Sequence, residues 1–240
     1  MKTTPLKGKL YLIPTTLGEN NPDDVLPQTV KRAIDFIGKY IVENEKTARK
    51  FIKAIHPEKV QADLKISLLN KRTEATEHKA MLSPCLNGEN IGLMSEAGCP
   101  GVADPGAVIV KLAHENGIQV VPLVGPSSIL LAMMASGMNG QSFAFNGYLP
   151  IDREQKKKQI LFLENQVQKS GYSQIFMETP YRNNQLLEDL IKFLNPNTKL
   201  CIAANINHPT EEFIKTLKIS DWKNKKPELH KIPAVFVLGR

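Results

Sequence analysis

The most unusual segment of the sequence is IGLMSEAGCPGVADPG, residues 91–106. It opens with a short apolar run, and a helix-length amphipathic segment follows at residues 107–116. Between them, three glycines permit unusual backbone conformations and two prolines stiffen the loop. Such a loop at the carboxyl end of a parallel strand is where open α/β sheets bind ligands. A long turn capped by Asp104 is the structural alternative.

Short apolar runs alternate with helix-length segments throughout the first half of the chain. The predicted strands are residues 10–14, 40–43, 64–68, 91–95 and 118–122, and the predicted helices are residues 28–36, 46–55, 74–86, 107–116 and a helix from 127. This alternation predicts right-handed crossover units and a largely parallel sheet that is covered on both faces.

The pattern changes near residue 140. FAFNGYLP, residues 143–150, is followed by a Lys-rich helix, the apolar segment SQIFME and another helix. The predicted strands at residues 199–205, 213–218 and 232–238 then follow one another directly, which favours an antiparallel or mixed sheet. We therefore expect two α/β domains: an N-terminal parallel domain at 1–139 and a C-terminal mixed domain at 140–240.

Composition and length exclude several classes of protein. The 240 residues are 42% hydrophobic and 23% charged, which is typical of a soluble globular protein. The longest apolar stretch, residues 129–138, is shorter than the roughly 18 residues of a membrane span, and the N-terminus lacks a secretory signal. Three widely spaced cysteines fit a reducing compartment, and the five histidines show no metal-ligand spacing. We expect a cytoplasmic protein without membrane contact or a metal site.

The net charge of +7 is unevenly distributed. Residues 151–240 hold 15 basic and 10 acidic side chains, so most of the surplus lies in the smaller part. An acidic partner such as RNA would explain this surplus. The lysine runs at residues 156–158 and 223–226, however, are of a kind that most often forms solvated faces.

Two further loops are predicted at the rim of the sheet that carries residues 95–106. In VPLVGPSS, residues 121–128, either serine could cap the next helix, whose positive dipole end would face a ligand. In LYLIPTTLG, residues 10–18, the first strand ends at a proline and turns. The sequence contains no dinucleotide-binding glycine motif, Walker A motif, nucleophile elbow or H-E-x-x-H motif, so the common phosphate cradles and hydrolase triads are unsupported.

Five segments carry a resemblance to one family. They are PTTLG (14–18), SEAGCPGVADPG (95–106), VVPLVGP (120–126), FNGYLP (145–150) and ETPYR (178–182). In this order they resemble the motifs P-T-P-I-G, S-D-A-G-T-P-x-x-x-D-P-G, V-V-P-L-P-G-P, F-x-G-x-L-P and E-S-P-H-R of the tetrapyrrole methylase superfamily of S-adenosylmethionine-dependent methyltransferases. The chain is most similar to the branch that methylates the 2′-hydroxyl of a cytidine in small-subunit ribosomal RNA.

Several polar positions depart from that branch. Its A-E-D-T-R is VENEK at residues 42–46, its L-N-E-H-N is LNKRT at 69–73, and its R-E-L-T-K is ANINH at 204–208. Charged groups are therefore lost or altered at Asn44, Arg72 and Ala204. The segments that resemble the cofactor-binding motifs match the family more closely than these polar positions do. The resemblance therefore supports methyl transfer more strongly than it supports the RNA target.

The resemblance implies that S-adenosylmethionine lies folded in a cleft between the two domains. The cofactor-binding residues that it implies are Pro14, Ser95, Glu96, Ala97, Gly98, Pro100, Val102, Ala103, Asp104, Ser127, Ser128 and Met177. Catalysis would come mainly from holding the acceptor oxygen in line with the methyl carbon. Glu178 is the first candidate base and Glu96 the second, and each could instead be structural. Arg182 would bind an RNA phosphate or form an internal salt bridge.

The implied partners are ribosomal RNA or the small ribosomal subunit, and a second copy of the chain in a homodimer. Two alternatives stay open at this point. One is a small-molecule methyltransferase of the tetrapyrrole type, and the other is a noncatalytic protein that binds S-adenosylmethionine.

Overall fold

The apolar runs of the N-terminal half form one five-stranded sheet of order β3-β2-β4-β1-β5, in which each pairing is parallel. The computed structural model describes residues 6–70 and 73–240. The strands are β1 (Lys9–Ile13), β2 (Lys39–Val42), β3 (Lys65–Leu68), β4 (Ile91–Met94) and β5 (Gln119–Pro122). All four residues of β4 are buried, as expected for a central strand of a parallel sheet. The predicted parallel sheet is confirmed.

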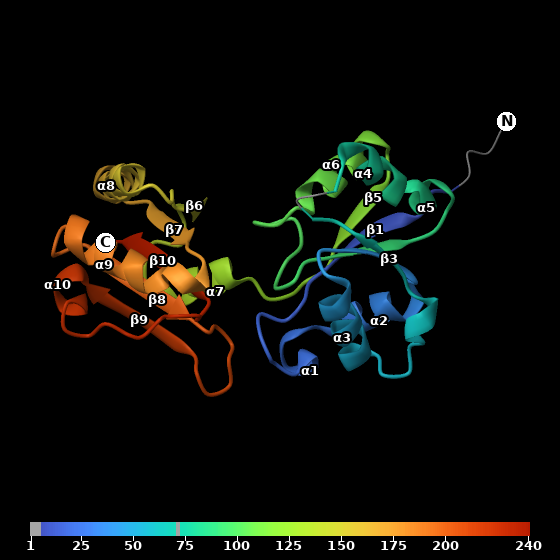
Figure 1. Cartoon of the computed structure of the whole chain (residues 1–240), viewed down its shortest axis with the longest axis horizontal. Helices are drawn as coiled ribbons and strands as arrows, with labels where there is room; N and C mark the ends of the chain where they lie inside the picture. Colours follow the sequence, from blue (N-terminus) through green and yellow to red (C-terminus); the bar gives the residue numbers. More distant parts are fainter. Residues whose placement is uncertain (1–5, 71–72) are drawn as a thin grey trace. The chain divides into compact units, whose positions relative to one another are not determined.

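Helices cover both faces of this sheet (Figure 1). In chain order they are α1 (Pro22–Val25), α2 (Gln28–Phe36), α3 (Glu45–Ile55), η1 (Gln61–Asp63), α4 (Ala75–Met81), α5 (Ser83–Leu86) and α6 (Ala107–Glu115). Helices α2 and α3 pack in one core cluster, and α5 and α6 pack in the cluster on the other face. The expected single helix at residues 74–86 is wrong, because Pro84 lacks the N–H that would continue α4.

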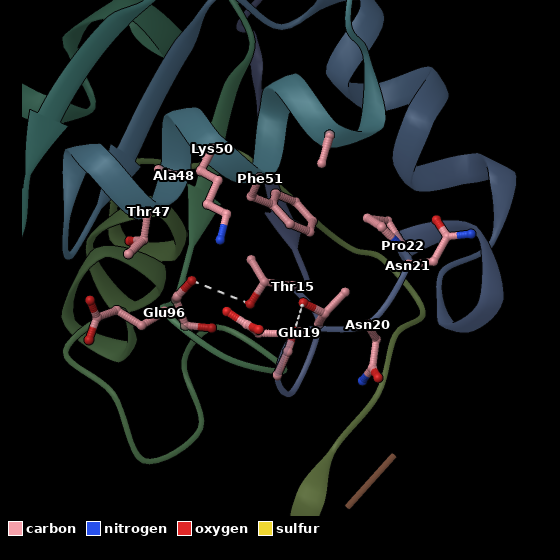
Figure 2. A pocket seen from close by; sticks show the side chains of 14 residues that line it. Thr15, Glu19, Asn20, Asn21, Pro22, Thr47, Ala48, Lys50, Phe51 and Glu96 are labelled. Carbon is pink, nitrogen blue, oxygen red and sulfur yellow. Dashed lines mark hydrogen bonds between the residues drawn. The ribbon is translucent and has the colours of Figure 1, made fainter. Parts of the chain in front are cut away.

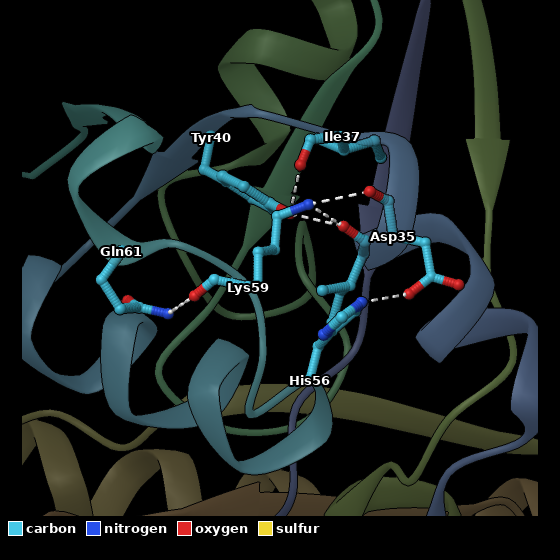
Figure 3. A network of polar contacts seen from close by, with 7 residues as sticks. Asp35, Ile37, Tyr40, His56, Lys59 and Gln61 are labelled. Atoms are coloured by element: carbon cyan, nitrogen blue, oxygen red, sulfur yellow. Dashed lines mark hydrogen bonds and ion pairs between the residues drawn. The ribbon is translucent and has the colours of Figure 1, made fainter.

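Two polar side chains close the C-terminal end of α2 (Figure 3). Lys59 Nζ donates to the carbonyls of Ile34 and Asp35, and Tyr40 Oη donates to the Ile37 carbonyl at 2.8 Å. Burial raises the pKa of Tyr40 and lowers the pKa of Lys59. These bonds satisfy carbonyls that a helix end leaves without partners, and they fix the junction between α2 and β2.

The C-terminal half contains a second sheet, of order β6-β7-β10-β8-β9. Its strands are β6 (Phe143–Tyr148), β7 (Ser173–Met177), β8 (Lys199–Ala204), β9 (Phe213–Lys218) and β10 (Ala234–Gly239). The β6–β7 pair is parallel and the other pairs are antiparallel, so the predicted mixed sheet is confirmed. The last strand begins at Ala234 rather than Ile232, since Pro233 has no N–H to donate to a ladder.

Helices α7 (Ser128–Ser136), α8 (Arg153–Ser170), α9 (Asn183–Phe193) and α10 (Ile219–Trp222), with the short helix η2 (Pro180–Arg182), complete this half. Helices α8, α9 and α10 share one core cluster with the sheet. Helix α7 packs against β8, β9 and β10 with side chains outside that cluster. Trp222, which is fully buried, donates its indole N–H to the Leu200 carbonyl at 3.0 Å.

The lysine run at residues 156–158 is not a solvated face throughout. Lys157 and Lys158 are exposed, but Lys156 is only 6% exposed. Its Nζ lies 3.2 Å from Asp189 Oδ2 on α9. The expectation is wrong for Lys156 because this residue begins the buried stripe of α8, which continues through residues 160, 163 and 167 at helical spacing.

By its internal contacts the chain divides into unit 1, Met1–Ser127, and unit 2, Ser128–Arg240. This division falls before α7, whereas the boundary expected between residues 139 and 140 falls after it. The altered position Arg72 lies outside the described residues. Over the part of the chain that the structure describes, no helix combines the length and the apolar character of a membrane span.

Candidate active site

The three loops singled out in the N-terminal half meet at one rim of the parallel sheet. Thr15 N donates to the Gly98 carbonyl at 3.0 Å, which joins the loop after β1 to the loop after β4. The Ser95 hydroxyl lies within 3.2 Å of the same Gly98 carbonyl. Cys99 Sγ donates to the Pro126 carbonyl at 3.4 Å, which brings in the loop after β5. The expectation of a common rim is confirmed.

A glycine allows the first and third loops to approach closely. A Cβ atom on Gly125 would lie 2.3 Å from both Cβ and Cγ of Pro14. Real Cβ atoms do not approach another carbon so closely, and a proline ring cannot swing away. Glycine at this position therefore allows PTTLG and VGP to pack against each other.

The rim coincides with a change of direction in the chain. Strands β1 and β4 are neighbours, yet the chain leaves β1 for α2 and leaves β4 for α6, which belong to core clusters on opposite faces of the sheet. Loops that diverge from adjacent parallel strands leave a crevice at their carboxyl ends, where α/β proteins bind ligands. The loops at residues 14–18 and 95–106 flank this crevice.

A pocket of about 470 Å³ opens beside these loops, within the usual size range of small-molecule sites (Figure 2). Helix α3 supplies one wall, from which Phe51 and the ammonium group of Lys50 face the pocket. Its lining residues are Thr15, Thr16, Gly18, Glu19, Asn20, Asn21, Pro22, Thr47, Ala48, Lys50, Phe51, Ala54, Ser95 and Glu96. Lys50 and Phe51 both belong to the helix predicted at residues 46–55, and the sequence pattern did not indicate that they line a pocket.

The loop at residues 95–106 is organised by Asp104. Its Oδ1 accepts hydrogen bonds from Gly101 N at 2.8 Å and Gly106 N at 2.7 Å. Burial raises the pKa of Asp104, although these two bonds partly offset the effect. Ala103 adopts φ 60, a left-handed conformation that costs a residue other than glycine about 1–2 kcal/mol. The capped turn considered from the sequence is present, and it holds the loop in a strained shape.

Asp104→Ala should loosen this loop, because Gly101 and Gly106 would lose their shared acceptor. We expect the free energy of unfolding to fall by about 1–2 kcal/mol and the affinity for S-adenosylmethionine to fall severalfold, as measured by urea titration and calorimetry. Asp104→Asn keeps an acceptor oxygen and serves as the control for the loss of stability. Equal losses of stability in both variants would show that the charge matters, not the two hydrogen bonds.

Three carboxylates gather at this rim: Glu43, Glu96 and Asp104. Burial raises the pKa of Glu43, the neighbouring Asp104 and Glu96 carboxylates raise it further, and a hydrogen bond from the backbone N–H of Glu96 lowers it in part. Sequence reasoning missed Glu43. Two signals could have identified it. Glu43 directly follows β2, which neighbours β4 in the sheet, and its position matches the Glu of A-E-D-T-R.

Asn44, one of the altered positions, has a structural role. Its Oδ1 accepts from Lys46 N at 3.0 Å and Thr47 N at 3.3 Å, and it thereby caps α3. An aspartate could cap this helix in the same way. The loss of the acid at residue 44 therefore leaves the pocket wall formed by α3 intact.

In unit 2, Glu178 and Arg182 form an ion pair. Arg182 Nη2 lies 2.6 Å from Glu178 Oε1, which also accepts from Thr179 N at 2.7 Å. Burial alone would raise the pKa of Glu178, but these bonds and the nearby Lys156 outweigh it, so the pKa lies below its usual value. The internal salt bridge, one of the two roles considered for Arg182, is therefore present. Among the described residues, Glu178 Oε2 and Arg182 Nε have no hydrogen-bond partner.

The predicted site residues fall into two groups. Pro14, Ser127 and residues 95–104 belong to the rim loops of unit 1, whereas Ser128, Met177, Glu178 and Arg182 belong to unit 2. Met177 ends β7 and pairs with Val235 on β10. Among the residues described, His, Cys, Asp and Glu side chains form no group suited to a metal ion.

The family model of tetrapyrrole (corrin/porphyrin) methylases matches residues 28–219. The chain belongs to the tetrapyrrole methylase family. It is thus an S-adenosylmethionine-dependent methyltransferase, as the sequence resemblance implied. Several curated relatives of this tetrapyrrole methylase carry the name "Ribosomal RNA small subunit methyltransferase I". The relative from Bacillus subtilis is 31% identical over 91% of this chain and 71% of its own length. The relative from Escherichia coli O157:H7 is 27% identical over 85% of this chain and 68% of its own.

Solved structures confirm the fold of this tetrapyrrole methylase. The methyltransferase CobJ matches with a TM-score of 0.64 and 18% identity over 97% of this chain and 94% of its own. Uroporphyrin-III C-methyltransferase from Thermus thermophilus, solved with S-adenosylhomocysteine, matches with a TM-score of 0.59 and 15% identity over 97% of this chain and 98% of its own.

The rim of unit 1 fits a positively charged cofactor. S-adenosylmethionine carries a sulfonium cation, and the carboxylates of Glu43, Glu96 and Asp104 would be relieved of mutual repulsion by a nearby positive charge. Hydrogen bonds within and between the loops hold their backbone in fixed positions. The chemistry of the rim therefore agrees with the cofactor that the family uses.

Proposed function

We propose that this tetrapyrrole methylase transfers the methyl group of S-adenosylmethionine to the 2′-hydroxyl of a ribose in small-subunit ribosomal RNA. The observation that carries the proposal is the rim of unit 1. There the hydrogen bond from Thr15 N to the Gly98 carbonyl joins two family motifs beside a pocket. The choice of RNA is supported by the relatives named for ribosomal RNA methylation. The surplus of basic side chains in residues 151–240 agrees with an RNA substrate.

The proposed roles follow from position. We assign cofactor binding in unit 1 to Pro14, Ser127 and the loop at residues 95–104, and in unit 2 to Ser128 and Met177. The bound sulfonium supplies an activated methyl group, so the main task of the chain is to orient the acceptor oxygen. The acceptor also loses a proton, for which a carboxylate with a raised pKa is better suited than one with a lowered pKa.

This criterion changes the order of the candidate bases. Glu43, whose pKa is raised, becomes the first candidate, and the exposed Glu96 at the pocket remains the second. Glu178, whose pKa is lowered by Arg182, is better suited to holding Arg182 in place. The exposed part of the Arg182 side chain, which is 39% exposed overall, would then be available to an RNA phosphate or a hydroxyl group.

Two measurements on one preparation test the proposal. Calorimetric titration measures binding of S-adenosylmethionine, and tritium transfer from labelled cofactor to undermethylated small ribosomal subunits measures activity. Label in the RNA, located at a ribose 2′-oxygen, is the expected result. Binding without transfer to RNA would contradict the proposed acceptor and would favour a small tetrapyrrole acceptor or a noncatalytic role.

Binding of the cationic cofactor should depend on the protonation of Glu43. Its raised pKa means that the carboxyl keeps its proton to a higher pH than an ordinary glutamate, while a cation favours the ionised form. Affinity should therefore increase as the pH rises through this pKa, and binding should release a proton. Glu43→Gln should weaken binding about tenfold at neutral pH and abolish the release, as measured by calorimetry in buffers of different ionisation enthalpy.

The exposed Glu45, two residues further along, provides the matched control as Glu45→Gln. Unliganded stability offers an independent check. An acid with a raised folded-state pKa contributes stability below its unfolded pKa and loses it as the pH rises through the folded pKa. In Glu43→Gln the unliganded protein should therefore no longer lose this contribution to its stability as the pH rises. An unchanged proton release in Glu43→Gln would exclude this residue from the cofactor site.

The location and assembly of the protein remain predictions. We place it in the cytoplasm with its ribosomal substrate and expect a homodimer. Sedimentation analysis at several protein concentrations tests the dimer, and a monomer at concentrations that support full activity would contradict it.

A further inference from the structure

The loop before β10 is strongly basic. Residues 223–231, KNKKPELHK, form what we call the basic loop, which contains four lysines and one glutamate. All four lysines are exposed. Glu228, the single carboxylate of the loop, is also exposed, and it accepts hydrogen bonds from Asn184 Nδ2 and from His230 N at 2.8 Å. The basic loop therefore presents mostly cations to solvent.

Contacts with η2 and α9 hold the basic loop in place. Leu229, which is buried, donates its N–H to Asn184 Oδ1 at 2.8 Å, and Lys231 N donates to the Pro180 carbonyl at 3.0 Å. Asn183 Nδ2 donates to the Ile232 carbonyl at 2.7 Å immediately after the loop. Cations on an ordered backbone lose less conformational entropy when they bind a partner. A mobile solvated tail would lack this arrangement.

An exposed aromatic ring lies against the same loop. Tyr181 of η2 is 69% exposed, and its ring meets the His230 ring edge to face, with centroids 5.9 Å apart. Tyr181 occupies the position of the His in the family motif E-S-P-H-R, so this chain carries a larger aromatic surface there. An exposed aromatic ring beside an ordered group of cations is the combination that binds single-stranded nucleic acid, because the ring stacks on a base and the cations neutralise phosphates.

We propose that Tyr181 and the basic loop bind a single-stranded segment of the RNA substrate, with one base stacked on Tyr181 and the adjacent phosphates near Lys225, Lys226 and Lys231. This inference rests on the proposed function and adds a docking surface in unit 2. Stacking requires an unpaired base, whose faces a duplex would cover. The surface therefore selects an unpaired segment rather than a helical stem.

Fluorescence anisotropy of the whole protein with a short labelled RNA, either single-stranded or annealed as a blunt-ended duplex, tests the surface. Tyr181→Ala should weaken single-strand binding about tenfold and leave duplex binding unchanged, whereas Tyr181→Phe should retain both affinities. Replacing Lys225, Lys226 and Lys231 by Gln should reduce the slope of log affinity against log salt by about two to three. Tyr172→Ala, at a residue that is 50% exposed, is the control for the tyrosine variant. Lys111→Gln, at a lysine whose side chain is 76% exposed, is the control for the lysine variant.

Methyl transfer to small ribosomal subunits, assayed alongside, separates this inference from the proposed function. If the Tyr181→Ala and lysine variants methylate RNA and bind the single strand like the wild type, the docking surface is overturned while the function stands. If the wild type transfers no methyl group to RNA but its single-strand binding depends on Tyr181, the function fails and the surface stands. Equal losses for single strand and duplex in Tyr181→Ala would also overturn the stacking role. Unchanged calorimetric binding of S-adenosylmethionine in each variant controls for misfolding.

Discussion

Lys156→Met should lower the free energy of unfolding of unit 2 by about 3–5 kcal/mol, the usual cost of removing one partner from a buried ion pair. Both side chains of the Lys156–Asp189 pair are only 8% exposed. After the substitution, the Asp189 carboxylate would stay buried with Gln185 as its nearest donor, at 3.3 Å. Urea unfolding monitored by the fluorescence of the buried Trp222 would measure the loss.

The neighbouring Lys158 supplies the control for this experiment. It lies on the same helix but is exposed, so Lys158→Met should change stability by less than about 0.5 kcal/mol. The double variant Lys156→Met/Asp189→Leu should recover most of the loss, because two apolar side chains can replace a buried ion pair. A large loss that persists in the double variant would show that shape, rather than unpaired charge, explains the effect.

Gly125→Ala should damage both stability and cofactor binding. The new Cβ would collide with the ring of Pro14 at 2.3 Å, so the loops after β1 and β5 must separate. Overpacking of this kind costs about 1–3 kcal/mol. We expect the affinity for S-adenosylmethionine to fall more than tenfold, since displacement of PTTLG also disturbs the bond between Thr15 and Gly98. Thermal unfolding and calorimetric titration measure the two effects.

Gly38→Ala is the matched substitution, because a Cβ at Gly38 would meet no atom within 4 Å. It should leave cofactor affinity unchanged. If Gly125→Ala and Gly38→Ala behave alike, the close approach of the two loops has no role in the site.

The arrangement of unit 1 was largely predictable from local patterns. A buried parallel strand reads as an unbroken apolar run, and β4 is buried at each position. The carboxyl ends of parallel strands share one edge, so the sequence pattern predicts that three loops distant in sequence lie at one rim. The contacts of Thr15 with Gly98 and of Cys99 with Pro126 confirm this prediction.

Features that depend on distant residues were not predictable in this way. Lys156 looked like part of a solvated lysine run, because its partner Asp189 lies 33 residues further along the chain. Glu43 lies near Glu96 and Asp104 because the order of the strands puts β2 next to β4, and local sequence patterns do not give that order. The pairing of Glu178 with Arg182 also required the turn at η2, which the sequence pattern had not indicated.

The position of β10 has a consequence for biosynthesis. This strand is formed by Ala234–Gly239, yet it lies between β7 and β8 and pairs with both. During translation, unit 1 has all five of its strands once Pro122 has emerged from the ribosome. Unit 2 must keep β7 and β8 apart, with their inner edges unpaired, until β10 has been released. The nascent chain therefore exposes two open strand edges until residues 234–239 have been synthesised, and open edges of this kind are prone to pair wrongly.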